Sequence, residues 1–338
     1  MAQFLHAPIT RPWRLRPVRG HTKRDFLSLR DLTIVEFDEL LHFAAEVKQH
    51  PAAFRDALRG RCAALIFEKP SLRTRVTFEV GMTQLGGQAV YLSQSDIALG
   101  KREAVKDVAQ NLARWVDVLV VRTFSHALLE EMAAQAHIPV INALSYLLHP
   151  CQALADLLTL REQRGELHGL QLAFVGDGSN NVAQALAQAA AKGGVHLTIA
   201  APRGFEPHAG IFAQARADAA LTGGSLLVVY DPADAVHNAD AVYTDVWTSM
   251  GQEEDAERRR KIFAPYQVNS YLMALAKPDA LFLHCLPAHR GEEVTDEVLD
   301  GLHSVVLEQA ENRLHVDKAL LLALAAETAV PSSIEGSR

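Results

Sequence analysis

The segment QLAFVGDGSNN, residues 171–181, joins a short apolar run to a polar, glycine-containing loop. We expect Gln171–Val175 to form a buried strand and a helix to follow over about Asn181–Lys192. The loop resembles the turn of a dinucleotide-binding fold, but Val182 and Ala183 stand where that motif has its third glycine. A nicotinamide dehydrogenase therefore stays an alternative, while asparagines at a helix start suit a carboxylate or ammonium ligand.

Similar apolar runs alternate with helical patterns on both sides of this segment. Such alternation predicts parallel sheets with helices on both faces. Its restart near residue 149 predicts an α/β fold of two doubly wound domains with parallel sheets, linked by helices. The other expected strands are Ala63–Phe67, Gln88–Leu92, Asp117–Val121, Pro139–Asn142, Val195–Ala200, Leu226–Tyr230, Ala241–Thr244 and Leu281–His284. The other expected helices are Leu72–Leu85, Val105–Trp115, His126–Ala136 and Arg313–Ala326.

The expected domain organisation has a tail over 1–22, a first domain over 23–148 and a second over 149–312. The joint lies at His149-Pro150 because proline favours the first position of a helix. A C-terminal helix over 313–330 is expected to pack back on the first domain. The first 24 residues contain six basic residues and no acidic one, which suits either a targeting segment or a loosely docked tail.

Composition narrows the possible partners. The 338 residues carry a net charge of −7, which argues against binding to nucleic acid or an anionic membrane surface. No apolar run approaches the roughly 20 residues that span a bilayer. Three widely spaced cysteines favour a reducing compartment, and we expect a cytoplasmic protein. An anion site must then be a local concentration of Arg, His and backbone N–H groups.

Ligands of open α/β sheets bind beyond the carboxyl ends of the strands, and the first such loop precedes the expected helix at Leu72. Ser71 is a candidate helix cap. The free N–H groups of the first turn, together with Arg73 and Thr74, would form a phosphate cradle. The alternative is a capped helix with solvent-facing arginines. Arg122 ends an apolar strand, so it faces either this crevice or a structural ion-pair partner.

Later loops supply further polar groups. His149 and Gln152 lie in the first turn of one helix and can both donate to a carbonyl oxygen; a nearby phosphate would raise the pKa of His149. Asp245 follows a strand and suits an ammonium group. Trp247 and Met250 predict an apolar flap. The charged segment Gln252–Lys261 predicts a solvated helix.

Cys285 ends the last expected strand, beside Leu286 and Pro287. A single cysteine among many histidines leaves a thiol protease as an alternative. The Leu-Pro step instead suits a strained turn with a cis proline, whose carbonyl groups would face the crevice. The His and Cys residues lack the spacing of zinc ligands, so no metal is expected.

Taken in order, these motifs resemble the transcarbamylase family, and within it the ornithine branch, from Lys23 to about Ala326. The resemblance is carried by SLRTR at 71–75, Arg122, HPCQ at 149–152, DVWTSMG at 245–251 and HCLP at 284–287. It implies transfer of the carbamoyl group from carbamoyl phosphate to the δ-amine of L-ornithine, giving L-citrulline and phosphate. It implies no cofactor, and a homotrimer or a multiple of trimers. Putrescine or another amine is the alternative acceptor, and a catalytically silent relative is a further alternative.

The resemblance also assigns roles to residues. Catalysis would use Arg122, His149, Asp245 and Cys285. Carbamoyl phosphate would contact Ser71, Leu72, Arg73, Thr74, Arg122, His149, Gln152, Cys285, Leu286 and Arg313. Ornithine would contact Asn181, Asp245, Ser249 and Met250. Two positions depart from the family pattern, because Leu72 replaces the usual threonine and Ala98 replaces a glutamine that many relatives have.

Overall fold

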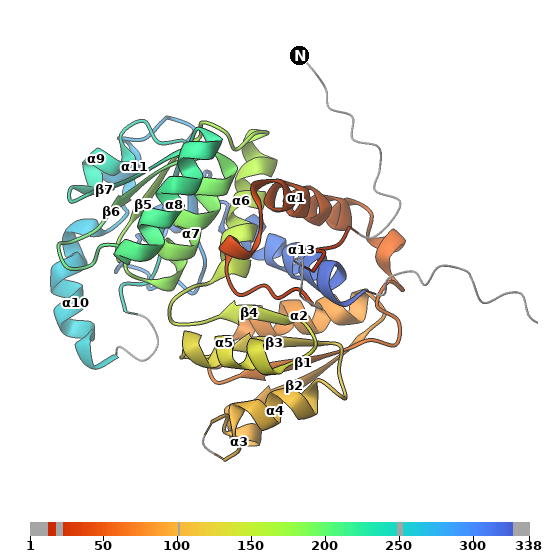
Figure 1. Cartoon of the computed structure of the whole chain (residues 1–338). Helices are drawn as coiled ribbons and strands as arrows, with labels where there is room; N and C mark the ends of the chain where they lie inside the picture. Colours follow the sequence, from red (N-terminus) through yellow and green to blue (C-terminus); the bar gives the residue numbers. More distant parts are fainter. Residues whose placement is uncertain (1–12, 18–22, 101, 249–252, 327–338) are drawn as a thin grey trace, which may run out of the picture.

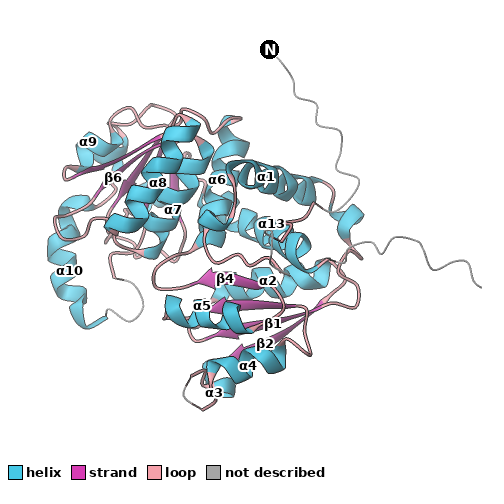
Figure 2. Ribbon diagram, in the orientation of Figure 1, coloured by secondary structure: helices cyan, strands magenta, loops and turns pink. Residues whose placement is uncertain are grey.

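The computed structural model describes residues 13–17, 23–100, 102–248 and 253–326. Two parallel sheets organise the chain, and helices cover both faces of each sheet (Figures 1 and 2). The first sheet has the order β2-β1-β3-β4 and the second the order β7-β6-β5-β8-β9. This arrangement confirms the predicted fold class.

All nine expected strands are present, with ends that move by at most two residues. The first sheet contains β1 (Cys62–Phe67), β2 (Gln88–Ser93), β3 (Val118–Arg122) and β4 (Val140–Leu144). The second contains β5 (Gln171–Val175), β6 (His196–Ala200), β7 (Ser225–Val229), β8 (Ala241–Thr244) and β9 (Leu281–His284). The central strands are continuous apolar runs because helices bury them from both sides.

The helices alternate with these strands. They are α1 (Ile34–Gln49), α2 (Leu72–Gln84), α3 (Gln94–Ile97), α4 (Val105–Leu112), α5 (His126–Gln135), α6 (Pro150–Arg164), α7 (Asn181–Gly193), α8 (Ala209–Thr222), α9 (Pro232–Val236), α10 (Ala256–Phe263), α11 (Ser270–Met273), α12 (Asp296–Leu299) and α13 (Val306–Ala325). Short 3-10 turns cover Leu29–Asp31, Pro51–Phe54, Glu253–Asp255 and Ala264–Tyr266. No helix in these described ranges is long and apolar enough to cross a membrane.

Two buried helices, α6 and α13, join the halves of the molecule. Every residue of α6 from Pro150 to Leu160 is buried. Helix α13 packs against α1, α2 and α6, and it lies between the two sheets (Figure 1). It begins at Val306, seven residues before the expected start at Arg313. No side chain caps its first turn, so the sequence carried no capping signal for the true start. Arg313 therefore lies inside the helix, 1% exposed.

The N-terminal segment has one described piece, residues 13–17, which lies against the first half. The backbone N–H of Leu15 donates to the carbonyl of Ala323 at 3.2 Å. Trp13 packs against Phe43 with 6.1 Å between ring centroids. These contacts place this piece of the basic segment on α1 and α13.

The interior of α13 generates the first prediction. Leu320→Ala removes a side chain with 0% exposure and leaves a cavity, so it should lower the free energy of unfolding by about 2–5 kcal/mol. Leu307→Ala, on the same helix but 73% exposed, should change it by less than about 0.5 kcal/mol. Urea unfolding followed by circular dichroism measures both. Equal losses in the two variants would contradict the packing described for α13.

Candidate active site

The loop between β1 and α2 forms the expected cradle. The Ser71 hydroxyl caps α2 by accepting from the backbone N–H of Thr74 at 3.2 Å. Leu72 is the first residue of the helix and is 75% exposed. The Arg73 guanidinium crosses to the other half of the molecule and donates to the carbonyl of Leu286. The carboxyl ends of the two sheets therefore meet at this loop.

Three guanidinium groups converge here, from Arg73, Arg122 and Arg313. The Arg122 side chain ends β3 and donates to the Thr74 hydroxyl at 3.4 Å. Burial, and then the charges of the other two arginines, lowers its pKa to about 10. Burial likewise lowers the pKa of Arg73. Such a concentration of positive charge attracts an anion, although the whole chain carries a net charge of −7.

Arg313 is held between a neutral and an acidic partner. Its Nη1 donates to Gln152 Oε1 at 2.8 Å, and its Nη2 lies 3.5 Å from a carboxylate oxygen of Asp317. Burial raises the pKa of that carboxyl to about 6. The Arg313 Nε and Nη2 atoms have no hydrogen-bond partner within the described ranges, so a bound anion would satisfy donors that are already buried.

His149 lies just before α6 and is 6% exposed. Burial lowers its pKa well below the ordinary histidine value, and the charges of Arg313, Arg122 and Arg73 lower it further. The sequence led us to expect that a neighbouring phosphate would raise this pKa. The charged groups that face the ring in this structure are cations, and they lower it. The ring is therefore neutral and carries one N–H donor, and its Nδ1 has no hydrogen-bond partner within the described residues.

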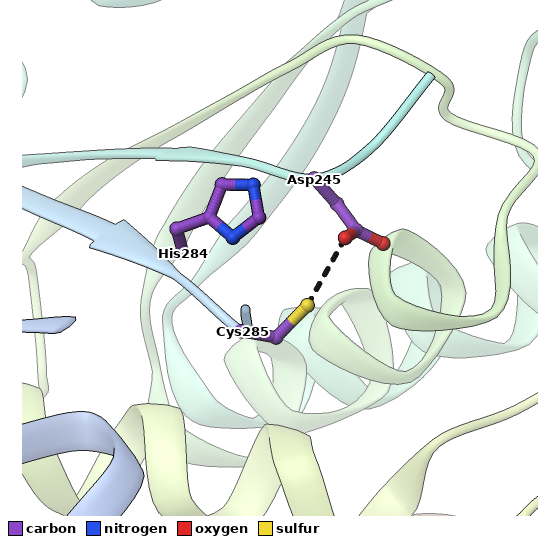
Figure 3. A group of neighbouring side chains, drawn as sticks. All are labelled: Asp245, His284 and Cys285. Atoms are coloured by element: carbon purple, nitrogen blue, oxygen red, sulfur yellow. Dashed lines mark hydrogen bonds between the residues drawn. The ribbon is translucent and has the colours of Figure 1, made fainter. Parts of the chain in front are cut away.

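The second half contributes Asp245 and Cys285, from the ends of β8 and β9 (Figure 3). The Cys285 thiol donates to Asp245 Oδ1 at 3.0 Å. Burial raises the pKa of this thiol well above its ordinary value, and the Asp245 charge adds to the shift. A thiol that keeps its proton is a poor nucleophile, which argues against the thiol-protease alternative.

Asp245, His284 and Cys285 place their donor atoms within 4.8 Å of one another, the kind of cluster that can hold a metal. Both ring nitrogens of His284 are already used, because Nδ1 accepts from the Leu286 N–H at 2.8 Å and Nε2 lies 3.2 Å from Glu293 Oε1. The thiol proton is also committed to Asp245. These groups are arranged as hydrogen-bond partners of one another, so they fit a metal ion poorly.

The turn after Cys285 has the predicted conformation. The Leu286-Pro287 peptide bond is cis, and Leu286 has a φ of +57°. Its carbonyl accepts from Arg73, so at least this carbonyl group faces the site as expected.

The ornithine-site prediction named Asn181, whose amide donates to the carbonyl of Ser145 at 2.8 Å in the first half. The preceding Asn180 makes the contact with Asp245, at 3.1 Å, and caps α7 by accepting from the N–H of Ala183. Sequence reasoning missed Asn180, although its place before the helix was a capping signal. The expected ligands Ser249 and Met250 lie outside the described residues, as does Met250 of the expected flap.

One expectation about the loop after β8 was wrong, and a second holds except at one residue. Trp247 is 3% exposed and stacks on Phe263 with 6.1 Å between centroids, so this residue belongs to the core. Helix α10 forms within the charged segment and exposes most of its charged side chains as expected, but Arg259 is buried. Its guanidinium forms an ion pair with Asp177 and donates to the Trp247 carbonyl at 2.5 Å. The buried carboxylate after β5 requires a cation, and the sequence alone did not show which residue supplies it.

Comparison with known proteins identifies relatives along nearly the whole chain. Residues 24–162 match the aspartate/ornithine carbamoyltransferase, carbamoyl-P binding domain, and residues 168–324 match the Asp/Orn binding domain of the same family. An ornithine carbamoyltransferase from Anoxybacillus flavithermus is 52% identical over 303 residues, which are 89% of this chain and 96% of the relative.

Solved structures agree with these sequence matches. The ornithine carbamoyltransferase of Pyrococcus furiosus superposes with a TM-score of 0.87 at 48% identity, covering 91% of this chain and 99% of its own. An acetylornithine transcarbamylase complexed with acetylcitrulline superposes with a TM-score of 0.82 at 31% identity, covering 90% and 99%.

The buried ion pair generates the second prediction. Arg259→Met leaves the Asp177 carboxylate buried without its cation and should lower the free energy of unfolding by about 3–5 kcal/mol. Arg258→Met is the matched control, because its side chain is 68% exposed and should matter by less than about 1 kcal/mol. Thermal and urea unfolding measure the difference. If the two variants are equally stable, the Arg259 pair contributes nothing.

Proposed function

The chain belongs to the aspartate/ornithine carbamoyltransferase family, and from that premise we propose that it is an ornithine carbamoyltransferase. It transfers the carbamoyl group from carbamoyl phosphate to the δ-amine of L-ornithine, giving L-citrulline and phosphate. The observation that carries this conclusion is the convergence of Arg73, Arg122 and Arg313 around His149, where the two sheets meet. The nicotinamide alternative has no comparable support, because the loop after β5 is bound to Asp245 and Arg259.

The first half would bind and activate carbamoyl phosphate. The phosphate group would lie at the N-terminus of α2, near Ser71 and Arg73, where helix N–H groups and a guanidinium favour anions. Negative charge develops on the carbamoyl oxygen as the amine attacks. Arg122, Thr74 and the neutral His149 ring would donate to that oxygen from a water-poor site.

The second half would position ornithine. Asp245 is a buried carboxylate that already accepts from Cys285 and Asn180, and burial raises its pKa. Such a group attracts the ammonium end of an amino acid. The attacking δ-amine must be neutral, and the three guanidinium groups disfavour its protonated form. Asn181 and the Ser249–Met250 segment complete the proposed ornithine site, and closure over it would exclude water.

We divide the chain functionally as the motifs suggest, into a carbamoyl-phosphate domain over 23–148 and an ornithine domain over 149–312. The C-terminal helix contributes Arg313 to the first of these. A cytoplasmic location is proposed on the three free cysteines, which suit a reducing compartment.

We propose that the protein assembles as a homotrimer, or as a multiple of trimers. Support comes from an uncovered apolar stripe on α2, formed by Leu72, Val76 and Val80 at four-residue spacing and 75%, 43% and 36% exposed. Strand β2 lies beside it at the edge of the first sheet and exposes Val90. Adjacent exposed apolar residues of this kind mark protein–protein interfaces.

The third prediction concerns the acceptor. Purified protein should form carbamoylated product from carbamoyl phosphate and ornithine at least tenfold faster than from putrescine, aspartate or N-acetylornithine. N-acetylornithine is included because of the acetylornithine transcarbamylase neighbour. Arg73→Ala, which removes a cradle cation, should lose most of this activity and so exclude a contaminating enzyme. A faster reaction with any of the other three acceptors would refute the assignment.

The fourth prediction concerns assembly. Val80→Glu places a charge in the apolar stripe and should convert trimers to monomers in sedimentation velocity runs. Val35→Glu is the control, because Val35 is 64% exposed on α1, outside the stripe, and its change should leave the trimer intact. A Val80→Glu protein that still sediments as a trimer would place the interface elsewhere.

A further inference from the structure

Asp156 is a buried acid that no role assigned above requires. It lies one turn after Gln152 on α6 and is 0% exposed. Its Oδ1 accepts from Gln152 Nε2 at 2.8 Å and from Gln309 Nε2 at 2.7 Å. A buried carboxyl is costly, and burial raises the pKa of this one to about 7. Of these two glutamines, Gln152 is the one expected to contact carbamoyl phosphate.

The two neighbours of Gln152 determine which way its amide points. The guanidinium of Arg313 can only donate, so the Gln152 atom 2.8 Å from its Nη1 must be the oxygen. The Asp156 oxygen that faces the other end of the amide accepts, so that end must be the nitrogen. A flipped amide would put N–H against N–H at Arg313 and oxygen against oxygen at Asp156. The orientation of the amide is therefore set by the donor on Arg313 and the acceptor on Asp156.

Gln309 holds Asp156 in place from the other side. Its Oε1 accepts from the backbone N–H of His284 at 3.0 Å, so its Nε2 must face Asp156, and this nitrogen also lies 3.1 Å from the Tyr243 hydroxyl. Asp156 Oδ1 thus accepts two N–H bonds, and any proton on this carboxyl belongs on its other oxygen. The carboxyl can therefore orient Gln152 in either charge state.

An amide oxygen has two acceptor positions, and Arg313 occupies one of those on Gln152. The other can accept from a donor in the site, and the –NH₂ of a carbamoyl group is such a donor. We propose that Asp156 is a positioning residue, which holds the Gln152 amide with its oxygen toward the site so that this oxygen receives the carbamoyl –NH₂. The proposal rests on the proposed function, because it takes carbamoyl phosphate as the ligand.

Substitutions at Asp156 provide the first test. Asp156→Leu removes the acceptor at similar volume, and we expect the KM for carbamoyl phosphate to rise on the order of tenfold, as for loss of one oriented hydrogen bond. The KM for ornithine at saturating carbamoyl phosphate should change less than about twofold. Asp156→Asn is the conservative variant. Its Oδ1 can still accept both N–H bonds, so it should stay within about threefold of wild type.

Exchanging the carboxyl of Asp156 and the amide of Gln152 provides a second test, which does not depend on whether Asp156→Leu folds. At alkaline pH, where both carboxyls are ionised, Gln152→Glu sets one carboxylate against another and should raise the KM for carbamoyl phosphate strongly. Adding Asp156→Asn removes one of the two facing negative charges, while the introduced carboxylate still accepts toward Arg313 and the site. The double variant should recover at least tenfold of the loss.

The outcomes separate the two claims. Wild-type protein that forms no citrulline would overturn the proposed function itself. Wild-type activity with no recovery in the double variant would overturn the positioning role alone. The positioning role would also be overturned if Asp156→Asn is as impaired as Asp156→Leu, or if the KM values for both substrates rise equally.

Discussion

Mutual repulsion among three guanidinium groups, two of them buried and the third half-buried, is the constraint on which the rest of this site depends. Arg73, Arg122 and Arg313 approach one another closely enough that all three lower the pKa of His149, and Arg313 and Arg73 lower that of Arg122. A protein can keep such a cluster only if neutral acceptors and acidic groups compensate it. The acceptors are the Leu286 carbonyl, the Gln152 amide and the Thr74 hydroxyl, and the acid is Asp317.

These compensating groups come from elements that are far apart in the chain, which explains the architecture around them. Helix α6 supplies Gln152 and Asp156, while α13 supplies Gln309, Arg313 and Asp317. Both helices are buried along most of their length between the two sheets. Gln152, Asp156, Gln309 and Arg313 form a chain of hydrogen bonds with one another, so the scaffold that joins the halves is also the support of the anion site.

The sequence predicted the strands better than it predicted which side chains pair with one another. Buried parallel strands are short continuous apolar runs, so β5, β8 and β9 were located to the residue. The strand-end rule then placed Arg122 and Cys285 at one crevice, and a Leu-Pro step predicted the cis bond. Pairs such as Arg259 with Asp177 are separated by 82 residues, and only the folded chain brings them together. The first seven residues of α13 were missed because its start lacks a capping side chain.

The contact between Arg73 and the Leu286 carbonyl also bears on how the protein distinguishes ligands. An anion that draws Arg73 away leaves that partly buried carbonyl without its donor, which disfavours the exchange unless the ligand supplies another donor. Carbamoyl phosphate carries both an anionic group for the arginine and an –NH₂ for the carbonyl, so it can replace both ends of the broken bond. Inorganic phosphate can replace only one. On the proposed function, the same hydrogen bond would favour the unreacted donor over the released product, and it would disfavour simple oxyanions in so basic a site.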